Sequence, residues 1–258
     1  MPFFINLQNH LAKKEFLNPK PIKNKNGEYI NQINNKPCVI MSFLEGSKTA
    51  KISTNHCRQI GKQLAIMHQH TFDFTFSRQN TLQQKNWKDL FEKFKDDKQN
   101  PYQNMFESIE KELDFLDQNW TKKLPFRVIH ADVFQDNVFF INDVFSGIID
   151  FYFACNDYFS YDLAICINAW CFEQNSVINN EKLNVLVEGY QNNKKLSAEE
   201  ITALPILLRG ASIRILLTRL HDKIYHPQGA FVKPKDPMEF YRILEFHQKN
   251  KNLILKTI

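Results

Sequence analysis

The stretch from His130 to Asp150, HADVFQDNVFFINDVFSGIID, constrains this chain more than any other part of it. It reads as a loop, a strand, a turn and a second strand, and it places Asp132, Asn137 and Asp150 at fixed spacing. Asp and Asn close together in a loop are ordinary turn residues. The complete order is more specific, because an apolar run at 126–129 precedes the loop and another apolar run ends at Asp150. The stretch therefore predicts a functional site.

The chemistry of such a site follows from its residue types. His130, Asp132 and Asn137 have the spacing H-x-D-x-x-x-x-N of a protein-kinase catalytic loop. Asp150, which precedes Phe151, occupies the place of the second metal-binding acid. Phosphoryl transfer needs a carboxylate that accepts the hydroxyl proton, and amide and carboxylate oxygens that bind Mg²⁺. The stretch contains each of these groups and predicts a Mg²⁺-dependent phosphoryl-transfer site.

Composition excludes several other classes of protein. With 258 residues, 43% of them apolar, the chain can bury a substantial core in one or two domains. Its 33 Lys and Arg residues are scattered among 28 Asp and Glu residues, which argues against a nucleic-acid partner. No apolar run long enough to cross a bilayer and no leader pattern are evident, so we expect no membrane partner. Five cysteines without a C-x-x-C pair are typical of reduced core residues, and we expect a cytoplasmic protein.

The first 46 residues predict a small helix-and-sheet unit. Residues 3–14 have the apolar spacing of an amphipathic helix. Turn residues, above all Asn26-Gly27, then predict three antiparallel strands at about 20–24, 28–33 and 37–43. Glu45-Gly46 ends the last strand. We therefore predict two domains, a partial N-terminal lobe (1–46) and a C-terminal lobe (47–258).

Residues beyond this boundary are predicted to be mainly helical. Ser53 or Thr54 can cap a helix that runs to about His70. His68 and His70 are expected to be polar residues favoured by the helix C-terminus, with metal binding as the alternative. Further helices are predicted after Pro101 and at 160–173, 181–193, 198–224 and about 237–249.

Two of these helices carry residues of interest. The helix at 160–173 is apolar on nearly every side, so Asp162 in its first turn needs a reason. The Asp162 carboxylate can cap the helix, or it can accept hydrogen bonds from the backbone of the catalytic loop. The helix at 198–224 is expected to bend or break around Pro205.

Taken in order, these segments resemble the aminoglycoside phosphotransferase-like kinases, and within them the homoserine kinases, over nearly the whole chain. The most specific matches are VIHADVFQDNVFF (128–140), GIIDFYFACNDYFSYDLAICINAWCFE (147–173), LPILLRGASIRILLTRLHDKIY (204–225) and KPKDPMEF (233–240). The resemblance implies an α+β, protein-kinase-like fold of two lobes. An incomplete small antiparallel sheet would form the N-terminal lobe, and helices would form most of the C-terminal lobe.

The resemblance also implies roles for particular residues. Asp132 would be the catalytic carboxylate, and His130 would shape the catalytic loop. Asn137 and Asp150 would bind Mg²⁺, and Asp162 would be structural. The backbone at the hinge between the lobes would pair with the adenine of ATP; its residues are Ser42, Phe43 and Leu44.

The implied reaction is ATP-dependent phosphorylation of a small alcohol, with L-homoserine as the expected acceptor and threonine biosynthesis as the pathway. Homoserine carries an ammonium and a carboxylate, so its pocket should offer an acid and a base. Asp157, with Asn156, is the candidate for the ammonium. Arg209 or Arg214 is the candidate for the carboxylate, because a guanidinium matches that group bidentately. For either Arg, packing of the stem against the lobe is equally compatible with the sequence.

One departure from the resemblance matters for activity. We find no Gly-rich phosphate loop and no lysine to hold the phosphates before the predicted small sheet, and we expect an N-terminally truncated kinase with weak or absent activity. Two alternatives stay open: a non-catalytic, degenerate remnant of such a kinase, and a kinase for an aminoglycoside or a choline-like acceptor. The sequence carries no signal of oligomeric state.

Overall fold

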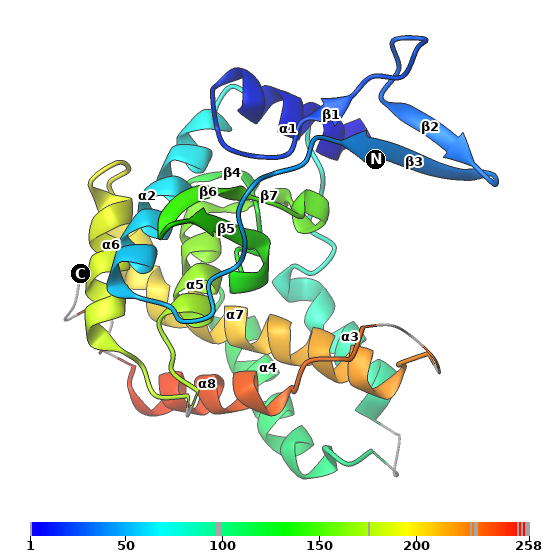
Figure 1. Ribbon diagram of the computed structural model, residues 1–258. Coiled ribbons are helices and arrows are strands. Elements are labelled where there is room, and N and C mark those ends of the chain that lie inside the picture. The colour runs from blue at the N-terminus through cyan, green and yellow to red at the C-terminus, as the bar shows by residue number, and fades with distance from the viewer. Residues whose placement is uncertain are drawn as a thin grey trace.

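The structure is a computed structural model that describes residues 2–95, 100–174, 176–227, 229, 232–251, 253 and 255. Helix α1 (Pro2–Lys13) opens the chain and buries Ile5, Leu7 and Leu11, as its amphipathic pattern predicts. Three strands follow, β1 (Pro21–Ile22), β2 (Ile30–Ile33) and β3 (Lys36–Met41). They form an antiparallel sheet in the order β1-β3-β2. In Figure 1, the β2–β3 pair projects away from the rest of the molecule.

The tight hairpin of this sheet lies at Asn34-Asn35 and not at Asn26-Gly27. Both Asn34 and Asn35 have positive φ, 51° and 61°, as a two-residue hairpin turn of the favoured type requires. Asn26-Gly27 instead lies inside a loop, closed by a 2.8 Å hydrogen bond from the Asn24 amide to the Glu28 carbonyl oxygen. The Asn-Gly pair marks a real turn, but the loop around it is too long to pair β1 with β2.

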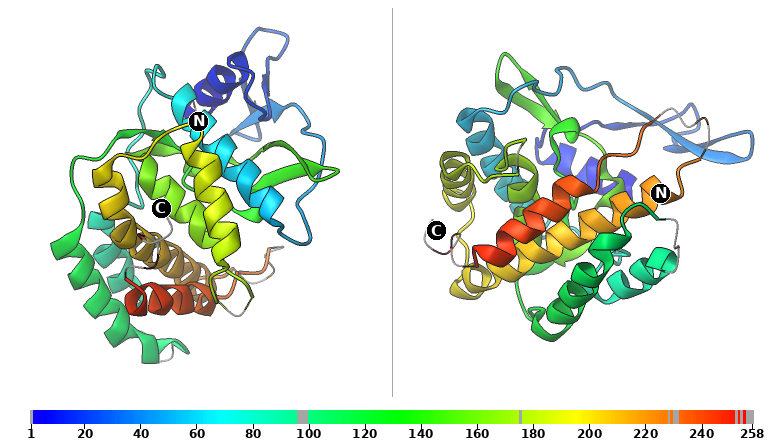
Figure 2. Two further views of the ribbon diagram at one scale, coloured as in Figure 1. Left: turned by 90° about the vertical axis from the view of Figure 1, so that its left-hand side faces the viewer. Right: turned by 90° about the horizontal axis from the view of Figure 1, so that it is seen from below.

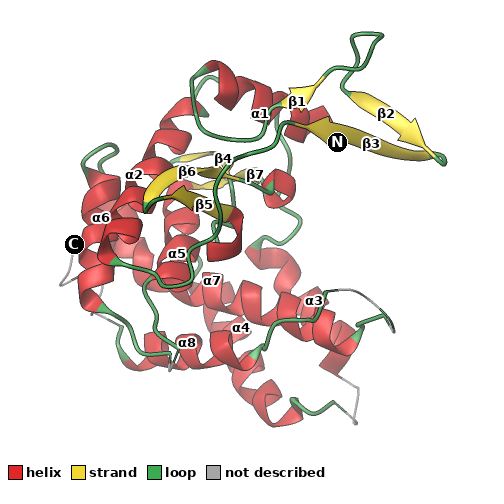
Figure 3. Cartoon of the chain, viewed as in Figure 1, coloured by secondary structure: helices red, strands yellow, loops and turns green. Residues whose placement is uncertain are grey.

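Helices dominate the rest of the chain, as predicted (Figure 3). They are α2 (Thr54–His70), α3 (Trp87–Lys95), α4 (Phe106–Asn119), α5 (Phe159–Trp170), α6 (Asn180–Gln191), α7 (Ala198–Ile224) and α8 (Met238–Lys249). Four short strands form two antiparallel pairs: β4 (Phe126–Ile129) with β7 (Cys155–Tyr158), and β5 (Val138–Ile141) with β6 (Val144–Ile148). The catalytic loop predicted from the sequence connects β4 to β5.

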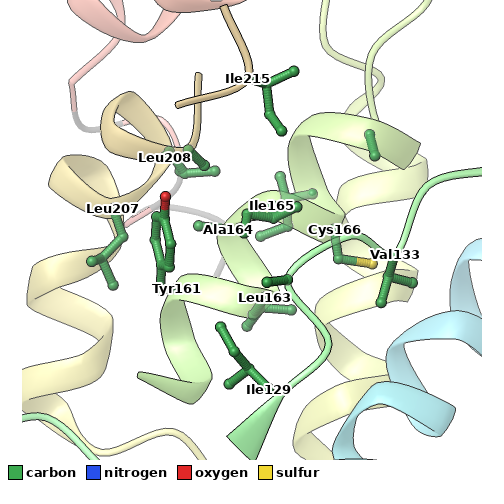
Figure 4. Packing of buried hydrophobic residues seen from close by; sticks show 14 of the residues in the cluster. Ile129, Val133, Tyr161, Leu163, Ala164, Ile165, Cys166, Leu207, Leu208 and Ile215 are labelled. Carbon is green, nitrogen blue, oxygen red and sulfur yellow. The ribbon is translucent and has the colours of Figure 1, made fainter. Parts of the chain in front are cut away.

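Helix α5 is the centre of the core. Every one of its residues from Phe159 to Trp170 is buried. Figure 4 shows Leu163, Ala164 and Ile165 of this helix among side chains of β4 and α7. Figure 2 shows α8 lying alongside α7. The apolar pattern of α5 therefore predicted its burial correctly. This buried helix fixes the position of the catalytic loop, which lies at the N-terminal end of α5.

Helix α7 departs from expectation in two respects. It runs without interruption from Ala198 to Ile224 through Pro205, so the predicted break is not observed. It starts at a capping box formed by Ser197 and Glu200. By length and composition α7 is also apolar enough to cross a membrane, contrary to the expectation that no such run exists; its most apolar 18-residue window has a mean hydropathy of 1.5. Within the protein 72% of that window is buried, as is usual for a core helix.

Helices α2 and α6 approach each other at two glycines. A Cβ atom added to Gly61 would lie 2.0 Å from the carbonyl oxygen of Leu186, and one added to Gly189 would lie 2.3 Å from that of Arg58. Such distances are far inside van der Waals contact, so only glycine allows the two backbones to pack this closely. This contact places the buried end of α2 next to α5 and the catalytic loop.

Candidate active site

The backbone of the catalytic loop is held by the Asp162 carboxylate. Its Oδ2 accepts a hydrogen bond of 2.9 Å from the His130 amide, and its Oδ1 accepts one of 2.8 Å from the Ala131 amide. Ala131 has φ of 63°, a left-handed conformation that is unfavourable for a residue with a Cβ. Asp162 thus holds the loop by hydrogen bonds, and its place in the first turn of α5 also suits the helix dipole, so the two roles considered for it are compatible.

Asp162 in turn belongs to a buried chain of hydrogen bonds that the sequence interpretation missed. His68 of α2 lies 3.0 Å from Asp162 through Nε2 and 2.9 Å from the Tyr190 hydroxyl through Nδ1. Burial lowers the pKa of His68, so the ring is neutral and its Nε2–H donates to the carboxylate. Burial alone would raise the pKa of Asp162, but the hydrogen bonds that it accepts from His68 and the His130 amide lower it overall. Asp162 is therefore an ionised, fully paired carboxylate inside the core.

A sequence signal for His68 was available. Ile60, Leu64 and His68 follow one another at intervals of four residues, so His68 lies on the apolar stripe of α2. A histidine on a buried stripe needs an internal partner, because a buried polar group without a hydrogen bond is unfavourable. His68 does lie in the last turn of α2, as expected, but the expectation lacked its buried partners Asp162 and Tyr190.

Two further side chains fix the loop from other directions. The His130 ring accepts a 3.2 Å hydrogen bond from the Asp132 amide at Nδ1 and donates from Nε2 to the Ile149 carbonyl oxygen at 3.1 Å. It therefore connects the catalytic loop to the residue before Asp150. Arg214 of α7 donates to the Ala131 carbonyl oxygen and lies over the Phe153 ring, 5.3 Å from its centroid.

Asp132 and Asn137 are oriented toward each other. The Asn137 side-chain amide donates to the Asp132 Oδ2 at 2.8 Å and to its carbonyl oxygen at 2.9 Å. Among the residues that the structure describes, Asp132 Oδ1 and Asn137 Oδ1 have no hydrogen-bond partner. Burial raises the pKa of Asp132 above its ordinary value, against the opposing charge of Arg214, and the nearby charge of Asp150 raises it further. The pair thus presents one free carboxylate oxygen and one free amide oxygen.

Asp150 projects from a sharp turn after β6. It has φ of 61° and ψ of 68°, and its side chain accepts from the Tyr152 amide as the turn Phe151–Phe153 begins. The residue is exposed. Because the His130 ring holds the adjacent Ile149, Asp150 and the catalytic loop are positioned together. Asn137 Oδ1 and the Asp150 carboxylate are hard oxygen donors, which fit Mg²⁺.

The predicted hinge lines a cavity of about 290 Å³ whose rim includes Asp150. Ser42 is engaged on both its backbone and its side chain, because its amide donates to the Lys20 carbonyl oxygen and its Oγ accepts from the Lys20 amide. The Ser42 amide is thus already paired within the protein. Within the described residues, the backbone groups of Phe43 and Leu44 make no hydrogen bond. Phe43 itself is 87% exposed at the mouth of the cavity.

The wall of this cavity is apolar and comes from distant parts of the chain. Its other lining residues come from α1, β3, β5 and the turn after β6, and they include Phe4, Ile5, Val39, Met41, Phe139, Ile149 and Tyr152. A flat apolar slot beside free backbone groups is suited to a purine base.

The acceptor residues predicted from the sequence do not all come together. Arg209 turns to α4, where its Nε and Nη2 donate to the Glu112 carboxylate at 2.7 and 2.5 Å and its guanidinium stacks on Phe115. The structure thus places the Arg209 guanidinium against α4 in a buried, bidentate ion pair, which uses its Nε and Nη2 atoms, and the assignment of Arg209 to substrate stays a prediction. Arg214 is the arginine that lies beside Asp132.

Asn156 and Asp157 also have partners within the protein. Asn156 Oδ1 accepts from the Arg78 amide at 2.8 Å. The Asp157 carboxylate accepts from Asn80 Nδ2 at 2.6 Å and from the Tyr158 amide at 2.8 Å, and burial raises its pKa. Both residues line a different cavity, which shares no lining residue with the hinge cavity.

Comparisons with known proteins agree with this geometry. Residues 1–191 match the phosphotransferase enzyme family. The chain is 46% identical over 248 residues to the homoserine kinase of Parvibaculum lavamentivorans, covering 96% of this chain and 77% of that protein. It is 46% identical over 253 residues to the homoserine kinase of Agrobacterium fabrum, covering 98% and 79%.

Solved structures share the fold at low sequence identity. The amicoumacin kinase hAmiN superimposes with a TM-score of 0.69 at 16% identity, covering 98% of this chain and 76% of the other. A spectinomycin phosphotransferase gives a TM-score of 0.67 at 14% identity, covering 97% and 83%. Both are kinases of the two-lobed, protein-kinase-like type predicted from the sequence. By its sequence and its fold, the chain belongs to the phosphotransferase enzyme family.

Proposed function

We propose that this protein transfers the γ-phosphoryl group of ATP to the side-chain hydroxyl of L-homoserine, giving O-phospho-L-homoserine and ADP in the cytosol. The observation that carries the proposal is the 46% identity to a homoserine kinase over 96% of this chain. The product would serve threonine biosynthesis, as the resemblance implies.

Asp132 is the proposed catalytic carboxylate. Its free Oδ1 accepts the proton of the acceptor hydroxyl while the hydroxyl oxygen bonds to the γ-phosphorus, and the bond from that phosphorus to the β–γ bridging oxygen breaks. Burial raises the pKa of Asp132, which makes it a stronger proton acceptor. The hydrogen bonds from Asn137 hold the carboxylate in a single orientation.

Asn137 and Asp150 are the proposed Mg²⁺ ligands. A bound Mg²⁺ would neutralise negative charge on the phosphates. Anchoring of the Asn137 Nδ2 on Asp132 leaves its Oδ1 facing away from that residue, which supports the assignment. Among the described residues that line the hinge cavity there is no lysine or arginine. We therefore expect this 258-residue chain to turn over below the range of about 1–100 s⁻¹ that is typical of kinases.

Arg214 is the proposed ligand for the homoserine carboxylate. It is buried, it lies near Asp132, and one guanidinium nitrogen is used by the Ala131 carbonyl oxygen. The remaining donors can hold a carboxylate. A choline-like acceptor or an aminoglycoside has no carboxylate, so Arg214 favours homoserine over both of these alternatives.

Turnover measurements test the proposal. With ATP and Mg²⁺, we expect ADP release that depends on L-homoserine and exceeds that with choline or an aminoglycoside. Asp132→Asn should lower this rate by at least about 100-fold. If the wild-type chain releases no more ADP than Asp132→Asn does with any of these acceptors, the non-catalytic alternative is correct.

A second measurement isolates the role of Arg214. The analogue 3-aminopropan-1-ol is homoserine without its carboxylate. In the wild type kcat/KM should favour homoserine, and in Arg214→Met this preference should fall by at least about tenfold, the size of one lost charge-assisted contact. If Arg214 only positions the loop, both acceptors should lose activity equally.

A further inference from the structure

The cavity that contains Asn156 and Asp157 has a volume of about 510 Å³. It lies between the segment that connects α2 to α3, the residues after α4, and strand β7. Neither Asp132 nor Asp150 lines it. It is therefore separate from the proposed phosphoryl-transfer site, and the reaction described above assigns no role to it.

Its charged lining favours an anion. Arg78, Lys85 and Lys122 contribute three cations, and none of them makes an ion pair within the residues that the structure describes. Gln83 Nε2 is buried and also lacks a hydrogen-bond partner. An anionic ligand would supply acceptors for the three cations.

The acidic groups near this cavity do not oppose an anion strongly. Asp157 is its one acidic lining residue, and it already accepts hydrogen bonds from Asn80 and the Tyr158 amide. Asp117, which accepts from the lining residue Gln84, is paired with Lys88. Cationic side chains thus outnumber the unneutralised acids in the lining.

Aromatic rings form another part of the wall. Trp120, Phe126 and Tyr158 line the cavity, and the Phe126 and Tyr158 rings meet edge to face at 5.8 Å. Such a surface contacts the apolar body of a ligand while the cations bind its charged end. The combination matches a small organic anion, in which a carboxylate or phosphate is attached to an apolar group.

Arg78 connects this cavity to the hinge cavity. Its Nη1 donates to the Ala154 carbonyl oxygen at 2.9 Å, immediately after the turn that begins at Asp150. Its guanidinium also lies 4.9 Å from the centroid of the Phe4 ring. The centroids of the Phe4 and Tyr152 rings lie 5.3 Å apart, and both residues line the hinge cavity. A ligand that moves the guanidinium changes the support of both Phe4 and the Asp150 turn.

We propose that this cavity binds a small organic anion and that the bound anion weakens nucleotide binding through Arg78. The anion competes for the Arg78 guanidinium, which then leaves the Phe4 ring and the Ala154 carbonyl oxygen. This proposal rests on the proposed function in one point, namely that the hinge cavity is the nucleotide site. Coupling of this kind is reciprocal, so nucleotide should weaken anion binding by the same factor.

Calorimetric titration of the full chain with benzoate and phenyl phosphate tests the site, with neutral benzamide as the uncharged control. At least one of the two anions should bind more tightly than benzamide, and the stronger of them identifies the charged group. Lys85→Ala/Lys122→Ala should weaken that binding by at least about fivefold, through loss of two ionic contacts. The matched control Lys111→Ala/Lys123→Ala removes two lysines outside the lining and should leave it unchanged. Equal binding of anions and benzamide, or equal loss in both double variants, would overturn the site.

The coupling is tested by titrating ADP with and without a saturating concentration of the bound anion. ADP affinity should fall by about threefold or more in the wild type, a modest coupling free energy. Arg78→Lys keeps the charge but cannot span the same contacts, so it should bind the anion and lose the effect on ADP. Unchanged ADP affinity in the wild type, or a persisting effect in Arg78→Lys, would overturn the coupling. These readouts need no turnover, so they are independent of whether homoserine is the acceptor.

Discussion

Different forces hold the catalytic loop and the small N-terminal sheet. His130 and Asp162 are fully buried and hydrogen-bonded through α2, α5 and α6. In the sheet, Ile33 and Ile40 are 65% and 60% exposed. The difference teaches that the geometry of the loop is set by internal polar contacts of the helical part. The sheet covers the cavity while burying little apolar surface of its own.

The largest effect should come from breaking the buried network at Asp162. Asp162→Asn removes the carboxylate that accepts hydrogen bonds from His68 and from two backbone amides, and each hydrogen bond to a charged group contributes about 1.5–3 kcal/mol, so the loss should exceed about 3 kcal/mol. Urea unfolding at pH 7 measures this loss of stability. The matched control is Asp143→Asn, whose carboxylate bonds to His56 but is 80% exposed, and it should change stability by less than about 1 kcal/mol. Similar small effects of both variants would contradict the comparison.

Acid should destabilise the helical part through His247. Burial, with the charge of Arg209, lowers the pKa of His247 to about 3. The unfolded state therefore binds the proton first as pH falls, so stability is full above about pH 6.5 and is lost progressively down to about pH 3, at about 1.4 kcal/mol per pH unit.

His247→Gln tests this pH dependence. It keeps a donor for Asn168 Oδ1, which lies 2.8 Å from His247 Nε2, and it should reduce the slope of stability between pH 6 and 4, as measured by urea unfolding. His221, which is 40% exposed, provides the control His221→Gln, and its slope should match the wild type. A steep slope that persists in His247→Gln would place the acid sensitivity elsewhere.

Tyr190→Phe should have a smaller effect on the same network. It deletes the hydroxyl that bonds to His68 Nδ1 and leaves that buried nitrogen unpaired, which costs about 1–2 kcal/mol. The control Tyr225→Phe removes an exposed hydroxyl that donates to the Lys93 carbonyl oxygen, and it should be nearly neutral in thermal unfolding. Equal stability of the two variants would show that the network ends at His68.

The smallest effect should appear in the sheet. Ile40→Thr keeps a β-branched residue at an exposed position, and stability should change by no more than about 0.5 kcal/mol. Ile60→Thr, the same substitution at a fully buried site in α2, is the control and should cost several times more by thermal unfolding. A large loss of stability in Ile40→Thr would mean that the Ile40 side chain is buried in solution.

Local patterns explain which parts of this molecule could be predicted. The span from Ser53 to His70 and the order of strands around the catalytic loop follow from caps, periodicity and turns, and the structure contains them. Arg209 and Arg214 could not be separated in this way, because five residues rotate a side chain by about 140° around a helix and the partner of each is distant in sequence. Glu112, which binds Arg209, is 97 positions away. The hinge cavity, built from α1, β3 and the turn after β6, is also beyond local patterns. The domain boundary at 46–47 stays a prediction.

The chain of hydrogen bonds from Tyr190 to Ala131 also bears on the order of folding. Tyr190, His68 and Asp162 come from three different helices, so the complete chain of contacts that ends at the left-handed Ala131 forms only when α2, α5 and α6 are docked. A partly assembled chain would hold the residues of the site without their arrangement. During refolding, catalytic activity should therefore return after, and never before, the change in tryptophan fluorescence that accompanies burial of the tryptophan side chains. Turnover would then report that assembly is complete.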